Sequence, residues 1–184
     1  MRSNIIKYAI LLFKLIVIAT ALILICFVYH IGVQWSSTND EYNKLVYETV
    51  TERDIYPAEK IINIVLFDRG HKGNKQPAEL LVRDSLNPRR HLDRHAQTFI
   101  LARRLEDRFS KDELLITYLS NAYFGGGDYG LTTAANSLYG KHVSELSDDE
   151  AIALAALIYG PNLRNNPEGW KVRQEMFKAE NDLP

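Results

Sequence analysis

The stretch that decides the fold runs Leu105-Glu106-Asp107-Arg108-Phe109-Ser110-Lys111-Asp112-Glu113-Leu114-Leu115. It contains a capping box, Ser110-x-x-Glu113, in which the serine hydroxyl accepts a hydrogen bond from the amide three residues on and the glutamate accepts one from the serine amide. The pattern predicts a helix that begins after Ser110 and runs to residue 122. A second box, Ser147-x-x-Glu150, predicts a helix over residues 151–159 that Gly160-Pro161 ends.

Other helices follow from hydrophobic periodicity. Residues 94–109 predict a helix with one apolar stripe, made by Phe99, Ala102, Leu105 and Phe109. Residues 131–138 predict another, and the glycines in Gly125-Gly126-Gly127-Asp128 indicate a bent loop before it. The apolar run over residues 61–67 fits a buried helix or a strand equally well. Since no pair of alternating strands with a hairpin turn is visible, the predicted class is mainly α.

The chain opens with a segment long and apolar enough to span a membrane. Residues 15–33 are apolar except for Thr20, His30 and Gly32, and about 20 such residues cross a bilayer as a helix. Basic residues precede the segment, which predicts a cytoplasmic N-terminus and an extracytoplasmic remainder. A cleaved signal peptide is the rival interpretation, but no Ala-x-Ala-like site follows, and Trp35 fits an interfacial anchor. We expect a single-pass protein of the cytoplasmic (inner) membrane.

This arrangement predicts three parts. Residues 1–33 form the cytoplasmic N-terminus and transmembrane helix, residues 34–56 a juxtamembrane linker and helix, and residues 57–184 one folded domain. The single cysteine, Cys26, lies inside the span, so no intrachain disulfide is available.

Charge is distributed unevenly along the domain. Residues 69–111 contain eleven Lys and Arg but five Asp and Glu, whereas residues 112–184 contain five basic and eleven acidic residues. A basic zone of this size suits nucleic acid, anionic headgroups or a diphosphate. An extracytoplasmic domain without a nucleic-acid-binding module excludes nucleic acid, so a lipid headgroup or diphosphate is favoured.

The pattern around the opening stretch resembles a known family. Tyr118-Leu119, Tyr123-Phe124-Gly125-Gly126-Gly127-Asp128-Tyr129-Gly130 and Leu138-Tyr139-Gly140-Lys141 continue it, and together they resemble the core of peptidoglycan glycosyltransferases, which polymerise lipid II. The family motif Lys-x-x-Ile-Leu-x-x-Tyr-Leu-Asn is nearly intact over residues 111–120, with serine at its last position. The resemblance covers about residues 57–167 and implies a lysozyme-like, mainly α domain.

The general base of such an enzyme is altered in this sequence. The family takes that base from a Glu-Asp-x-x-Phe-x-x-His-x-Gly motif, and here Phe67-Asp68 stands in place of Glu-Asp, with His71-Lys72-Gly73 after a shortened interval. Phenylalanine cannot accept a proton, so Asp68 is the nearest surrogate base. Its displacement by about an ångström would cost ~100-fold in rate. The alternative is a loop aspartate that turns the chain before Gly70.

The cationic part of the site is better preserved. The family's Thr-Gln-Gln-Leu-x-Lys-Asn signature places its lysine at Arg83, and its Arg-Lys-x-x-Glu signature keeps the arginine as Arg94 but replaces the glutamate with Thr98. The resemblance therefore implies that Arg83, Arg94 and Lys111 bind a diphosphate, as guanidinium and ammonium groups do. It implies no cofactor and no metal.

Two functions remain open at this point. The first is a membrane-anchored peptidoglycan glycosyltransferase-family protein of cell-wall synthesis that acts on or binds lipid II or another undecaprenyl-diphosphate precursor, with reduced or no polymerase activity. The second is a non-catalytic envelope accessory or scaffold that binds the precursor or a protein partner, such as another cell-wall synthesis protein. Whether the chain is an enzyme is open, and lysozyme-like hydrolysis lacks a spaced carboxylate pair.

Overall fold

The computed structural model describes residues 2–37, 39–49, 53–68, 76–85, 91–181 and 183. Over these residues the chain is helical, with one isolated antiparallel bridge between Tyr123 and Tyr129. The mainly α prediction is confirmed. The elements are α1 (Arg2–Ser37), α2 (Asn39–Glu48), α3 (Pro57–Asn63), the π-helical turn η1 (Ile64–Asp68), α4 (Pro77–Ser85), α5 (His91–Glu106), α6 (Lys111–Asn121), α7 (Leu131–Tyr139), η2 (Val143–Glu145), α8 (Asp148–Tyr159), η3 (Pro161–Asn165) and α9 (Pro167–Asn181).

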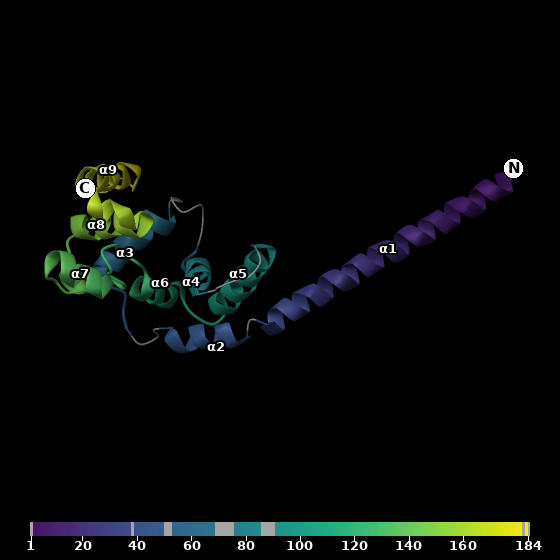
Figure 1. The fold of residues 1–184 in the computed structure, drawn as a ribbon, viewed down its shortest axis with the longest axis horizontal. Helices are drawn as coiled ribbons and strands as arrows, with labels where there is room; N and C mark the ends of the chain where they lie inside the picture. The colour runs from purple at the N-terminus through teal and green to yellow at the C-terminus, as the bar shows by residue number, and fades with distance from the viewer. Residues whose placement is uncertain are drawn as a thin grey trace.

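Helix α1 projects away from the other helices, which pack together into one domain (Figure 1). Its segment Leu12–Val33 spans 22 residues, has a mean hydropathy of 2.6 and buries none of its surface within the chain. By length and composition it can cross a membrane. Near its domain end, α1 contacts α5.

The main core of the domain surrounds α8. Every residue from 151 to 158 in this helix is buried, and the helix packs against α3, α9 and η3. The apolar run at residues 61–67 belongs to α3 and η1 rather than to a strand. Its inner residues Val65, Leu66 and Phe67 are buried in the same core.

A second, smaller cluster holds α2 against α4, α5 and α6. Its centre is Leu45 from α2, which packs with Leu81, Leu101 and Leu105. The predicted stripe of the α5 region is therefore only partly right, because Phe99 is 70% exposed. Residues 100–102 and 105 form the buried face, and Phe99 lies on the neighbouring, solvent-facing side of the helix.

Both capping boxes form as predicted. The Ser110 amide donates to Glu113 Oε2 at 2.7 Å and the Glu113 amide donates to Ser110 Oγ at 3.2 Å. The matching distances at Ser147 and Glu150 are 2.8 and 3.3 Å. Because Ser147 is the N-cap, α8 begins at residue 148, three residues earlier than predicted. Helix α5 ends at residue 106. The amides of the next three residues donate hydrogen bonds to carbonyls of α5 and form a turn before the α6 cap.

Candidate functional site

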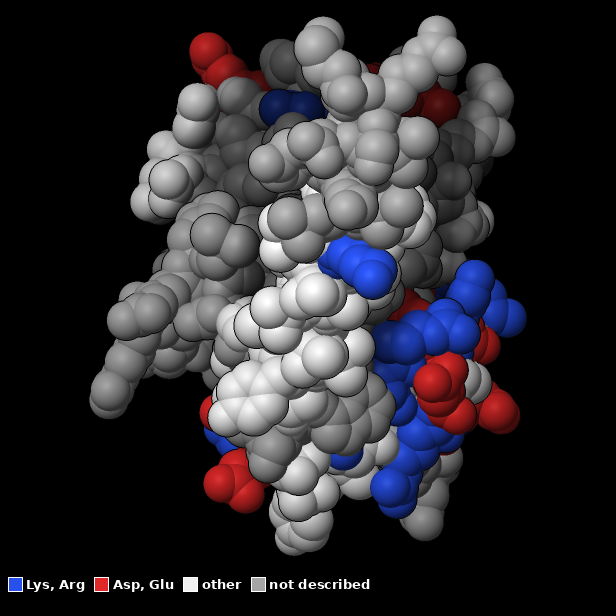
Figure 2. All heavy atoms as spheres, turned by 90° about the vertical axis from the view of Figure 1, so that its right-hand side faces the viewer, with Lys and Arg blue, Asp and Glu red and all other residues white. Residues whose placement is uncertain are grey.

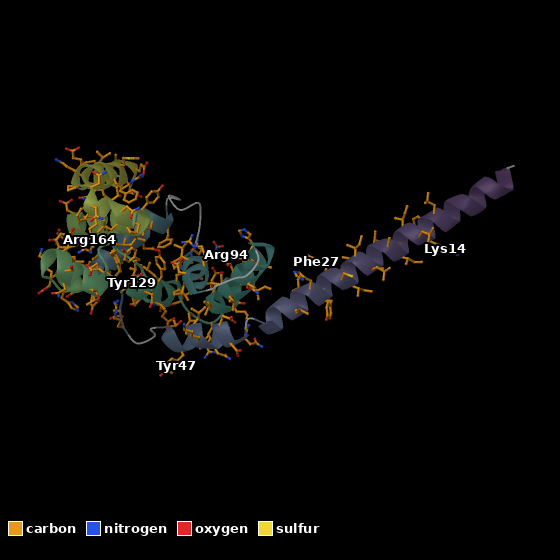
Figure 3. The ribbon with its side chains drawn as sticks, viewed as in Figure 1. Lys14, Phe27, Tyr47, Arg94, Tyr129 and Arg164 are labelled. Atoms are coloured by element: carbon orange, nitrogen blue, oxygen red, sulfur yellow. The ribbon has the colours of Figure 1, made fainter. Side chains whose placement is uncertain are left out.

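A cleft of about 660 Å³ lies beside the basic residues, at the junction of four helices and the turn after α6. We call it the cationic cleft. Figure 3 labels Arg94 on the α5 side and Tyr129 on the α6–α7 side of the domain. The lining residues are Lys44, Leu81, Arg83, Asp84, Arg94, Tyr118, Asn121, Ala122, Tyr123 and Tyr129.

Three cationic side chains from three different helices face this cleft. Lys44 comes from α2, Arg83 from α4 and Arg94 from α5. Of the described residues that line the cleft, only Asp84 carries a carboxylate, and its Oδ1 lies 3.2 Å from Arg83 Nε. Both partners are exposed enough that this pair is weak. The cleft therefore carries an excess of positive charge and favours an anionic ligand.

The wider distribution of charge agrees with this local excess. Viewed along α1, the domain shows Lys and Arg side chains gathered on one side of that helix, with acidic side chains interspersed (Figure 2). Helix α5, which contacts α1, carries Arg94, Arg103 and Arg104. The basic zone predicted from the sequence thus includes the part of the domain beside the membrane-spanning helix.

Tyr118 contributes a neutral phenol to the cleft. Its side chain is almost fully buried, and burial, with a smaller effect from Asp84, raises the pKa of Tyr118 well above its ordinary value. The phenol therefore stays protonated near neutral pH and can donate a hydrogen bond, but it cannot act as a general base.

Phe67, which the family resemblance aligns with the general-base glutamate, packs against this tyrosine. The two ring centroids are 6.0 Å apart at an interplanar angle of 81°, an edge-to-face contact. Phe67 is buried in the main core. The backbone of Asp68 ends η1, while its side chain and residues 69–75 lie outside the described residues.

The other nearby acids have different roles. Glu59 is almost completely buried, where its Oε2 accepts hydrogen bonds at 2.8 Å from Arg53 Nη1 and from the Tyr56 amide. Through these hydrogen bonds Glu59 holds residues 53–56 against α3. Glu79, on α4, is not among the described residues that line the cleft.

Lys111 lies apart from the two arginines. It borders a separate hollow of about 340 Å³, lined also by Arg103, Phe109 and Leu114. Helix α6 faces the cationic cleft only at Tyr118 and beyond, which at a rise of 1.5 Å per residue is roughly 10 Å along the helix axis from Lys111. The structure brings Arg83 and Arg94 together and places Lys111 elsewhere.

Several cleft residues were not predicted from the sequence. Asp84 follows Arg83 directly, and an adjacent acid in a basic zone could have been flagged. Tyr123 and Tyr129 flank the glycine run and belong to the pattern that carries the family resemblance, which assigned them no role in a site. No pattern in the sequence indicated Lys44. Its place in the cleft depends on its neighbour Leu45, which holds α2 on the domain.

No cluster of His, Cys, Asp and Glu with metal-ligand geometry occurs among the residues that the structure describes. The chemistry of the cationic cleft, as built, is that of anion binding by guanidinium and ammonium groups beside tyrosines.

Comparison with known proteins supports the family that the sequence resembles. A transglycosylase family model matches residues 74–181, more than half of the chain. The match includes Arg83, Arg94 and Lys111 and begins after Phe67 and Asp68.

Curated relatives are much longer proteins. Penicillin-binding protein 2a of Streptococcus pneumoniae is 36% identical over 102 residues, which cover 55% of this chain and 14% of that protein. Penicillin-binding protein 1A of Aquifex aeolicus is 43% identical over 76 residues, covering 41% and 10%. For penicillin-binding protein 2D of Bacillus subtilis the identity is 46% over 59 residues, covering 32% and 8%. The chain belongs to the peptidoglycan transglycosylase family, and its helical domain has the lysozyme-like fold of that family.

Proposed function

We propose that this cell-wall glycosyltransferase-family protein binds lipid II, or another undecaprenyl-diphosphate precursor, in the cationic cleft and has reduced or no polymerase activity. The observation that carries the proposal is the composition of the cleft, in which three cations face one ion-paired carboxylate. Because the chain spans about a seventh or less of the relatives named above, their full activities are not assumed for it.

A diphosphate fits the three cations better than a single carboxylate would. Guanidinium groups bind phosphate oxygens with two parallel hydrogen bonds, and Arg83 and Arg94 approach from different helices. One wall of the cleft comes from α2, which follows the membrane-spanning helix almost directly. The cleft thus lies close to the point where a lipid-anchored headgroup leaves the bilayer. We propose that this side of the membrane is extracytoplasmic, from the basic residues at the start of α1.

The proposal of reduced or absent polymerase activity rests on the lack of a suitably placed carboxylate. Deprotonating an acceptor sugar hydroxyl requires a carboxylate within hydrogen-bond reach. Asp84 lies beside a cation, with its Oδ1 3.2 Å from Arg83 Nε, and the family resemblance aligns Phe67, which has no carboxylate, with the glutamate. Any remaining polymerisation is proposed to use Asp68 as a surrogate base.

The test compares binding and polymerisation on the full chain in detergent. Lipid II is titrated onto the wild type, Arg83→Ala and Arg94→Ala, and glycan chains are measured in parallel samples. Binding that both variants weaken, with few or no chains, supports the proposal. Arg108→Ala, which removes an exposed arginine outside the cleft, is the matched control and should bind like the wild type.

Two further variants separate the remaining assignments. Loss of residual chains in Asp68→Asn, but not in Asp84→Asn, would assign the base to Asp68. Lys111→Ala tests the predicted contact in the separate hollow, and unchanged binding would remove Lys111 from the site. If lipid II does not bind, the scaffold alternative with a protein partner replaces the ligand-binding function.

A further inference from the structure

The turn between α6 and α7, residues 122–130, carries two of the tyrosines that line the cationic cleft, Tyr123 and Tyr129. We call it the tyrosine turn. The Phe124 amide donates to the Asp128 carbonyl at 3.0 Å, and the Gly130 amide donates to the Ala122 carbonyl at 2.9 Å. These bonds bring the Tyr123 and Tyr129 rings to a centroid distance of 4.8 Å. The residues are 41% and 64% exposed, so their rings remain available at the edge of the cleft.

The backbone of the tyrosine turn has little intrinsic order. Gly125, Gly126 and Gly127 have φ angles of +80°, +63° and +91°, in the left-handed region that favours glycine. Ordering a residue costs backbone entropy, and glycine loses the most. A short hairpin of this kind is marginally stable alone. Its position therefore depends on contacts from outside the turn.

Arg164 of η3 supplies these contacts. Its Nη1 donates to the Gly125 carbonyl at 2.7 Å and to Asp128 Oδ2 at 2.5 Å, and its Nη2 donates to Ser137 Oγ on α7 at 2.9 Å. The side chains of Arg164 and Asp128 are each only 17% exposed, so water competes weakly for this pair. The planar guanidinium thus joins η3, the tyrosine turn and α7 in one network.

The close fit of the turn onto η3 points to the same arrangement. A Cβ at Gly126 would lie 2.9 Å from the Arg164 guanidinium carbon, and a Cβ at Gly125 would lie 2.4 Å from the Pro161 carbonyl oxygen. Glycines are thus required both for the backbone angles and for the approach of η3. Arg164 itself does not line the cationic cleft.

We infer that Arg164 is a positioning residue: it holds Tyr123 and Tyr129 at the cleft and so sets the affinity of the cleft for its ligand without touching that ligand. The identity of the ligand rests on the proposed function. The phenol rings, rather than the arginine, supply the contact, and the network through Asp128 and Ser137 fixes where the rings stand.

The test uses the full chain in detergent, with undecaprenyl diphosphate as the probe. Arg164→Ala should weaken binding about 2- to 30-fold, the range seen for residues that act on a site through others. Arg164→Lys should recover part of the loss, because an ammonium can still pair with Asp128 but cannot form the three-way network. Hydrogen exchange of the Phe124 and Gly130 amides should become faster in Arg164→Ala while the protein remains folded.

A general loss of stability is distinguished in two ways. Lys141→Ala removes another ion pair of the same half of the domain, at 2.7 Å from Glu150, and should leave probe binding unchanged. In a Tyr123→Leu, Tyr129→Leu background, Arg164→Ala should have no further effect on binding, because the rings through which it acts are gone.

The outcomes also separate this inference from the proposed function. An equal effect of Arg164→Ala with and without the tyrosines, or unchanged amide exchange in the turn, would overturn the positioning role. If the wild type does not bind undecaprenyl diphosphate, the proposed function fails. Amide exchange then still decides whether Arg164 positions the tyrosine turn.

Discussion

The two hydrophobic clusters of the domain differ in what they support. The main core surrounds α8, whose residues 151–158 are all buried, and its helices α6 and α8 are capped at Ser110 and Ser147. The second cluster, centred on Leu45, is smaller, and the cationic cleft borders it. Helix α6 joins them, since Leu114 packs in the second cluster and Leu115 in the main core. The main core thus maintains the fold, and the second cluster positions the charges of the cationic cleft.

The largest effect should come from the main core. Leu154→Ala removes a fully buried side chain from the centre of α8 and should lower the free energy of unfolding by about 2–5 kcal/mol. Denaturant unfolding of the full chain in detergent, followed by the fluorescence of Trp170, measures it, since that indole donates to the Ala153 carbonyl at 2.8 Å. Val172→Ala, at an exposed position on α9, is the control and should change little.

The matching change in the second cluster is Leu45→Ala. If α2 docks as a local unit, this variant should leave the unfolding midpoint reported by Trp170 nearly unchanged and should weaken ligand binding, because Lys44 then loses its fixed place in the cleft. Titration with lipid II measures the binding. A midpoint lowered as far as in Leu154→Ala would contradict the division between the two clusters.

The next largest effect concerns the cleft itself. Arg94→Ala should weaken lipid II binding by roughly 10- to 150-fold, the loss of about 1.5–3 kcal/mol typical of a hydrogen bond to a charged group. Affinity should also fall with added salt, because exposed charges are screened. Titrations at two ionic strengths measure both. Binding that is independent of salt and of Arg94 would show that the cations of the cleft do not hold the ligand.

A smaller effect is expected at the helix caps. Ser147→Ala removes the side-chain acceptor for the Glu150 amide and should cost about 0.5–2 kcal/mol of stability without affecting lipid II binding. The equivalent change at Ser110, on the helix shared by both clusters, should cost a similar amount. Unfolding midpoints of the two variants provide the measurement, and weaker lipid II binding in Ser147→Ala would show that the core and the cleft are coupled.

The smallest effect is a dependence on pH at the tyrosine turn. The hydrogen bond from Arg164, with a smaller one from Ser137, holds the pKa of Asp128 below its ordinary value. A carboxyl group whose pKa is lower in the folded than in the unfolded state stabilises the fold at pH values above its unfolded-state pKa, about 3.9. This contribution is lost as the pH falls through the folded-state pKa. Asp128→Asn should therefore be less stable than the wild type at neutral pH.

Thermal unfolding at pH 7, 5 and 3 checks this dependence. The difference between Asp128→Asn and the wild type should be similar at pH 7 and 5 and should shrink at pH 3. A difference that stays constant down to pH 3 would show that the ionised carboxylate of Asp128 contributes nothing to the turn.

What could be predicted from the sequence follows the same division. Capping boxes and glycines are local signals, so both capping boxes and the turn at residues 125–128 were predicted correctly, although α8 begins three residues earlier than predicted. The cleft is built from contacts between segments far apart in the chain, and periodicity carries no information about these. Lys44 and Arg94 line the same cleft because α2 packs against α5, whereas Lys111, within the clearest motif, lies on another part of the surface.

The central claim is that the cationic cleft binds a lipid-linked diphosphate while the position of the general base is filled by Phe67. Its most direct test measures lipid II binding and glycan-chain formation in the same preparation of the full chain. The account predicts saturable binding that Arg94→Ala weakens, with chain formation slow or absent. Rapid polymerisation, or no binding at any accessible concentration of lipid II, would contradict it.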